Sequence, residues 1–157
     1  TGPYLLLGWS MGGLVAFEMA RLLELRGERP EMVFLVESYL SAQLPEFDED
    51  DEREKRDPVA EEDVSAAESL RLDLRRRANH AHLRAARAYR PSGYAGPVAL
   101  VQADRQDADF RRTAIRSWSC VCAPIRLTHH VLEGDHLTLF EPPYVTELAR
   151  LIDRTAP

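Results

Sequence analysis

A serine framed by glycines near the start of the chain restricts the possible folds more than any other feature. The stretch GWSMG at residues 8–12 follows a short apolar run at 4–7 and precedes a helical pattern at 11–26. A strand, a sharp turn and a helix in direct succession are typical of a nucleophile elbow, which presents the serine hydroxyl on a strained turn. Such a turn needs small residues two positions before and after the serine, here Gly8 and Gly12. We therefore predict that Ser10 is a nucleophile.

Apolar runs and helical patterns alternate along the rest of the chain. Strands are predicted at 4–7, 32–36, 98–103 and 125–132, and helices at 11–26, 108–118 and 144–154. Apolar runs of this kind are typical of strands covered on both faces. The alternation therefore predicts an α/β fold, with a mostly parallel sheet covered by helices. In the first helix, the spacing predicts one buried face formed by Leu14, Val15, Met19, Leu22 and Leu23.

The segment at about 41–91 interrupts this alternation, and we expect it to form a helical lid insertion. It begins with an acidic run at 46–52 that favours a solvated loop. Asp57-Pro58 is typical of a helix start, and SAAE at 65–68 fits a capping box. A further helix is predicted at 79–89. A helical decoration without a gating role is the alternative to a lid.

A nucleophilic serine requires a base, and the chain has five histidines. His80 and His82 fall in the insertion, where they are expected at the surface. His129 and His130 are neighbours in a predicted strand, so at most one of them faces the core. His136 lies in a glycine turn just after the last predicted strand, at the sheet edge expected for Ser10. The order serine, acid, histidine also suits a serine on such an elbow, and we predict His136 as the base.

Five stretches together carry a family resemblance. They are GWSMGG at 8–13, LVESYL at 35–40, ANHAHLRAARAYRPSGYAGPVALVQA at 78–103, the tryptophan at 118, and VLEGDHLTLFEPPYVTELA at 131–149. This combination resembles the type I thioesterase domain of nonribosomal peptide and polyketide synthases, which belongs to the α/β-hydrolase superfamily. The resemblance implies an α/β-hydrolase fold. It also implies that residues 1–157 are the C-terminal portion of a single thioesterase domain.

The resemblance further implies where the acid of a catalytic triad lies. In that family an aspartate followed by Ser/Thr-Tyr ends the strand after the elbow helix, and Glu37-Ser38-Tyr39 occupies this position. Asp104, which follows the strand at 98–103, is the alternative acid, with Asp107 and Asp109 close behind. A structural role for Glu37, capping a turn, is also open. We favour Glu37 because its Ser-Tyr neighbours and the insertion after it fit the type I pattern.

The chemistry implied by the resemblance is acyl transfer. Ser10 would attack a thioester on the phosphopantetheine arm of an acyl or peptidyl carrier protein, with the Met11 N–H as an oxyanion donor. Water, or an amine or hydroxyl of the same chain, would then release a free acid or a macrocycle. No cofactor or metal of the protein's own is expected. The alternatives are a carboxylesterase or lipase-like hydrolase of the same fold, or a catalytically impaired fragment that binds carrier protein or acyl chain.

Composition sets the remaining expectations. The net charge of −6 argues against a general affinity for nucleic acid or anionic membranes. No apolar run approaches the roughly 20 residues of a membrane span, and no signal peptide is recognisable. The two cysteines, spaced Cys-x-Cys, favour a reduced, cytoplasmic protein. Because the family's elbow follows the fifth strand of eight, the N-terminal strands are expected to be missing from this chain, and a separate N-terminal fragment is expected to complete the sheet.

Overall fold

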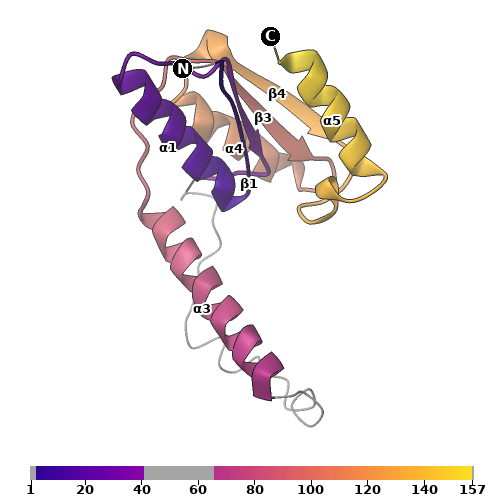
Figure 1. Ribbon diagram of the computed structural model, residues 1–157. Coiled ribbons are helices and arrows are strands. Elements are labelled where there is room, and N and C mark those ends of the chain that lie inside the picture. Colours follow the sequence, from indigo (N-terminus) through magenta and orange to yellow (C-terminus); the bar gives the residue numbers. More distant parts are fainter. Residues whose placement is uncertain (1–2, 41–65, 157) are drawn as a thin grey trace.

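The computed structural model describes residues 3–40 and 66–156, which are built around a parallel sheet (Figure 1). Its strands are β1 (Leu5–Trp9), β2 (Met32–Val36), β3 (Val98–Ala103) and β4 (Leu127–Leu132), in the spatial order β1-β2-β3-β4. Each neighbouring pair is parallel. The fold class predicted from the sequence is confirmed. The last strand begins two residues later than predicted, because Pro124–Arg126 form a short 3-10 turn.

Helices cover both faces of this sheet. They are α1 (Met11–Leu25), α3 (Ala66–Ala88), α4 (Ala108–Ser119) and α5 (Tyr144–Thr155), with a second 3-10 turn at Thr138–Phe140. Helices α1 and α4 pack on one face and α5 on the other (Figure 1). None of the described helices is both long enough and apolar enough to cross a membrane.

The core follows the alternation of side chains along β2 and β3. Val33, Leu35, Val98 and Leu100 point to one face, where they join Leu14, Phe17 and Ala20 of α1 and Trp118 of α4. Val36 and Val101 point to the other face, where they join Leu139, Leu148 and Leu151. Both strands are therefore buried on both sides, as expected for the central strands of a parallel sheet.

The buried face of α1 differs from the predicted one. Leu14 is buried, but Val15, Met19 and Leu22 are 49%, 47% and 45% exposed. The contact with the sheet is made instead by small residues, Gly13, Ala16 and Ala20, together with Leu14 and Phe17. Small side chains allow the helix to approach the strands closely. The larger apolar side chains therefore form a stripe on the outer side of the helix.

The described part of the insertion is one helix. The sequence predicts a helix after residue 65 and a separate one at 79–89, but α3 is continuous and contains no proline or glycine. Its C-terminal end approaches α1, whereas its N-terminal end projects away from the sheet (Figure 1). The acidic run at 46–52 and the predicted helix start at Asp57-Pro58 lie outside the described residues. The role of the insertion as a lid stays a prediction.

Strand β1 lies at an edge of the described sheet. Leu5 and Leu7 of this strand point to the same face and are 50% and 42% exposed. Among the described residues, only β2 pairs with β1. An exposed apolar edge strand is uncommon in a parallel sheet and is a ready surface for another strand.

Candidate active site

Ser10 forms the turn between β1 and α1. Its backbone has φ 54° and ψ −124°, a conformation that a non-glycine residue rarely adopts. The turn is held because the Ser10 N–H donates to the Val36 carbonyl at 2.9 Å and the Ser10 carbonyl accepts from the Gly13 N–H at 3.1 Å. The Ser10 hydroxyl does not cap the helix. The backbone therefore fixes Ser10 at the start of α1 and leaves its hydroxyl available.

Two glycines allow close contacts at this turn, and only one of them, Gly8, belongs to the pair that the sequence pattern indicated. A Cβ atom at Gly8 would lie 2.0 Å from the Gly12 carbonyl oxygen. A Cβ atom at Gly12 would meet nothing within 4 Å, so Gly12 itself has no steric need to be glycine. At Gly13, in contrast, a Cβ atom would lie 1.8 Å from the Ser38 hydroxyl oxygen. The tight contacts are therefore at Gly8 and Gly13.

The structure brings Glu37 and His136 together at the carboxyl ends of the strands. Nδ1 of His136 lies 3.2 Å from Oε2 of Glu37, whose side chain is fully buried. The Glu37 carboxylate also accepts from the Ala103 N–H at 2.7 Å and from the Gln106 amide at 3.3 Å. Burial alone raises the pKa of the Glu37 carboxyl, but hydrogen bonding, led by His136 and the Ala103 N–H, outweighs this effect, and the pKa lies below its ordinary value of 4.5.

Hydrogen bonds fix the loop that carries Glu37, as they fix the elbow. Glu37 has φ 49°, which makes it the second described non-glycine residue with a positive φ after Ser10. Its N–H donates to the Val101 carbonyl at 2.8 Å. The next residue, Ser38, accepts a buried hydrogen bond from Nε1 of Trp118 at 2.9 Å on its carbonyl oxygen. Trp118, part of the family resemblance, therefore supports the loop that carries Glu37.

The alternative acids lie elsewhere on the same sheet edge. Asp104 is exposed, and its Oδ1 accepts from the Gly134 N–H at 3.0 Å. Asp107 caps α4, where it accepts from the N–H groups of Asp109 and Phe110 at 2.8 and 3.0 Å. Among the described residues, Glu37 is the carboxylate that hydrogen-bonds the His136 imidazole.

Trp9, inside the elbow, contacts His136 in a way that the sequence did not indicate. Its indole N–H donates to the His136 carbonyl at 2.9 Å, and the two ring centroids are 5.2 Å apart. Phe140 packs edge-on against the same indole at 5.8 Å, and the Tyr39 ring stacks on the imidazole at 6.5 Å. A tryptophan between the elbow glycine and serine gives no signal that it will meet a residue 127 positions away.

His82, His129 and His130 make contacts of their own, away from the Glu37 carboxylate. His129 hydrogen-bonds Gln102 of β3 at 2.9 Å, and His130 hydrogen-bonds Thr128 of β4 at 3.2 Å. His82 of α3 is exposed, as expected, and it also borders the cavity described next. Its place there follows from the packing of α3 over the elbow.

A cavity of about 560 Å³ opens over the elbow. Ser10, Met11, Tyr39 and His136 line it from the sheet side, and Asn79, His82 and Leu83 of α3 line it from the opposite side. Within the described ranges, no group of three or more His, Cys, Asp or Glu side chains is arranged to hold a metal. The site thus combines a strained serine and a histidine that line one cavity with a buried carboxylate that contacts the histidine.

Comparison with known proteins places this geometry in a family. The family model of the thioesterase domain matches residues 1–155. Thioesterase pynI of Aspergillus niger is 43% identical over 51 residues, which are 32% of this chain and 18% of that protein. A mycosubtilin synthase protein of Bacillus subtilis is 26% identical over 158 residues, covering 93% of this chain and 5% of that protein.

Solved structures agree with this match. The NocB thioesterase domain, in covalent complex with a fluorophosphonate nocardicin G analog, is 29% identical with a TM-score of 0.74, covering 98% of this chain and 66% of that one. The Vlm2 thioesterase domain bound with a dodecadepsipeptide is 23% identical, with a TM-score of 0.72. The match covers 98% of this chain and 69% of that one, and it shows that the two share the fold. The chain thus spans about two thirds of the NocB domain and less than a fifth of pynI. It belongs to the thioesterase domain family.

Proposed function

We propose that the protein is a serine thioesterase that releases an acyl, peptidyl or polyketide chain from the phosphopantetheine thioester of a carrier protein. The observation that carries this proposal is the 3.2 Å contact between Glu37 and Nδ1 of His136 beside the strained Ser10. All three residues of such a triad would act on one cavity, which Ser10 and His136 both line. The membership in the thioesterase domain family supports the substrate class.

The hydrogen bond to Glu37 supports distinct roles for the two ring nitrogens of His136. Because the Glu37 carboxylate can only accept a hydrogen bond from Nδ1, that nitrogen carries the proton and Nε2 is left as the base. Nε2 takes the proton of the Ser10 hydroxyl as its oxygen attacks the thioester carbon, and the buried Glu37 carboxylate stabilises the resulting imidazolium. The described residues show no hydrogen bond from the Ser10 hydroxyl, in keeping with the looser catalytic contacts of unliganded enzymes.

Collapse of the tetrahedral intermediate would release the carrier thiol and leave an ester on Ser10. The Met11 N–H, at the start of α1, would stabilise the oxyanion. We propose that a second donor comes from a segment that also pairs with the exposed edge of β1. Losing one oxyanion donor costs about 100- to 1000-fold in rate. These 157 residues alone should therefore hydrolyse thioesters slowly unless that segment is supplied.

The proposed partner is an acyl or peptidyl carrier protein. The similarity to a mycosubtilin synthase protein supports this assignment. We also propose a cytoplasmic location, because Cys120 and Cys122 are both free thiols, which is typical of reducing compartments.

The test is a comparison of an acyl-pantetheine thioester with the matching oxygen ester, using the protein and Ser10→Ala. We expect faster hydrolysis of the thioester and loss of both activities in the variant. A preference for the oxygen ester would favour a carboxylesterase or lipase-like hydrolase instead. Binding of the thioester without turnover, by folded protein with the proposed strand segment supplied, would favour a fragment that binds carrier or acyl chain.

A further inference from the structure

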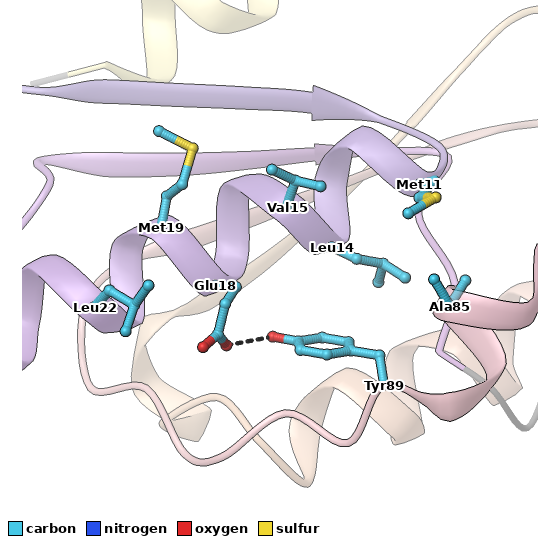
Figure 2. Close-up of a pocket in the computed structure, with 9 residues that line it drawn as sticks. Met11, Leu14, Val15, Glu18, Met19, Leu22, Ala85 and Tyr89 are labelled. Atoms are coloured by element: carbon cyan, nitrogen blue, oxygen red, sulfur yellow. Dashed lines mark hydrogen bonds between the residues drawn. The ribbon is translucent and has the colours of Figure 1, made fainter. Parts of the chain in front are cut away.

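A second hollow, of about 380 Å³, runs along α1 next to the cavity over Ser10 (Figure 2). The apolar stripe of α1 forms one side of it, and Ala85 and Tyr89 at the end of α3 form another. The α1 side chains that line it are Met11, Leu14, Val15, Met19 and Leu22. We call this hollow the α1 groove. Its lining includes the large apolar side chains of α1 that are half exposed, Val15, Met19 and Leu22.

The α1 groove begins at the nucleophile. Met11 directly follows Ser10, and Met11, Leu14 and Val15 border both the groove and the cavity over Ser10. Met11 and Leu22 lie at opposite ends of the groove (Figure 2). The rise of an α-helix makes the distance between them roughly 16 Å. A chain attached to the Ser10 oxygen therefore starts at one end of an extended channel.

The chemistry of the groove suits an apolar chain. Nearly all of its exposed lining is apolar, and its polar side chains already satisfy one another. The Tyr89 hydroxyl donates to Glu18 at 2.8 Å (Figure 2), and the Arg21 guanidinium donates to the same carboxylate at 2.6 Å. The bond from Tyr89 also ties the end of α3 to α1, which fixes the width of the groove. The polar side chains that line the groove are thus already engaged with one another or with Arg21, and the rest of the described lining is apolar.

We propose that the α1 groove holds the apolar part of the acyl group while that group is esterified to Ser10. The enzyme would then select acyl groups with an extended apolar segment over short ones. This inference rests on the proposed function, because it requires Ser10 to carry the acyl group. Each methylene group transferred from water into the groove should strengthen binding about fourfold.

Alkyl fluorophosphonates test the groove and the nucleophile separately. The Ser10 oxygen displaces fluoride from phosphorus, so the alkyl group is left where the acyl chain would lie. We would measure the second-order rate of adduct formation by intact mass for ethyl, butyl, octyl and dodecyl probes. The octyl probe should react at least about 100-fold faster than the ethyl probe if several methylenes are buried.

Substitution of Met19, in the middle of the groove, should reduce this selectivity. We expect Met19→Trp to lower the octyl-to-ethyl rate ratio about tenfold, since its ring fills the path of the chain. Met19→Gln keeps the size of the side chain but adds polarity, and should lower the ratio about fourfold. It provides a second test in case Met19→Trp does not fold. Leu25→Trp is the matched control, because Leu25 lies on α1, is 70% exposed and does not line the groove.

Four outcomes would overturn part of the account. Equal rates for ethyl and octyl probes would show that the groove does not hold the chain, as would an unchanged ratio in both folded Met19 variants. The same loss of ratio in Leu25→Trp would show that the effect is unrelated to the groove. An absence of any adduct, with every probe, would instead contradict the proposed function of Ser10.

Discussion

The loops after β2 and β3 each place a carboxylate at the same edge of the sheet, but the two carboxylates have different surroundings. Glu37 is fully buried, and its carboxylate contacts the imidazole of His136. Asp104 is exposed, and its carboxylate contacts the backbone N–H of Gly134, two residues before His136 in the same loop. Both acids therefore hold the histidine loop, one through the side chain and the other through the backbone.

The difference shows how neighbouring strands contribute to one site. A buried carboxylate surrounded by donors stays ionised and lies in the low-dielectric setting where its charge acts strongly on the imidazole. An exposed carboxylate is screened by water and contributes mainly geometry. Trp9 adds a third anchor, from the elbow, to the same loop. Substitutions at each of the three residues would separate these anchors.

The largest effect is expected for Glu37→Gln. The amide removes the charge that stabilises the imidazolium and no longer requires the proton on Nδ1, so kcat should fall by about 10⁴-fold. The measurement is steady-state hydrolysis of an acyl-pantetheine thioester, with circular dichroism to check the fold. An activity within tenfold of the unaltered protein would remove Glu37 from the triad.

A smaller loss is expected for Trp9→Phe, which keeps a ring beside His136 but removes the indole donor. Loss of one hydrogen bond should lower kcat by about fivefold with little change in KM, because the histidine loop is less firmly placed. Phe140→Leu is the control, since it removes a ring contact with Trp9 and leaves the hydrogen bond intact. Equal effects of the two variants would assign the role of Trp9 to packing.

A weaker effect is expected for Asp104→Asn. The side-chain oxygen of asparagine still accepts from the Gly134 N–H, so activity should fall by no more than about threefold. The same kinetic assay, run beside Glu37→Gln, decides between the two acids. If Asp104→Asn were inactive and Glu37→Gln were active, the roles assigned to the two loops would be reversed.

The smallest effect concerns stability in acid. The folded protein holds the pKa of Glu37 below its unfolded value, so this group stabilises the fold above the unfolded pKa and loses that contribution as pH falls through the folded pKa. The melting temperature of the unaltered protein, relative to that of Glu37→Gln, should therefore fall as the pH drops below about 4.5. A difference that stays constant between neutral and acidic pH would contradict the lowered pKa.

Much of the fold was predictable because β2 and β3 are short, uninterrupted apolar runs. Both were predicted with their observed bounds, 32–36 and 98–103. Helix α3 was split in the prediction because the charged stretch at its centre hides the apolar spacing, although nothing in it breaks a helix. The buried face of α1 was misplaced because spacing reveals an apolar stripe but not whether the sheet contacts it or the small residues beside it.

The candidate site was predictable only in part. The elbow pattern indicated Ser10, and the order of strands brought Glu37, Asp104 and His136 to one edge of the sheet. The sequence pattern alone does not decide between Glu37 and Asp104, because the choice depends on which loop places its carboxylate against the His136 imidazole. The close contact at Gly13 and the bond from Trp9 to His136 were not predictable, because they join segments far apart in the chain.

The most direct test of the central claim is the intact mass of the protein after reaction with a small fluorophosphonate. The claim is that Ser10 is activated by His136, which Glu37 holds in place. We predict a single adduct in the unaltered protein, none in Ser10→Ala and a much slower reaction in Glu37→Gln. Folded protein that forms no adduct, or an adduct that persists in Ser10→Ala, would contradict the claim.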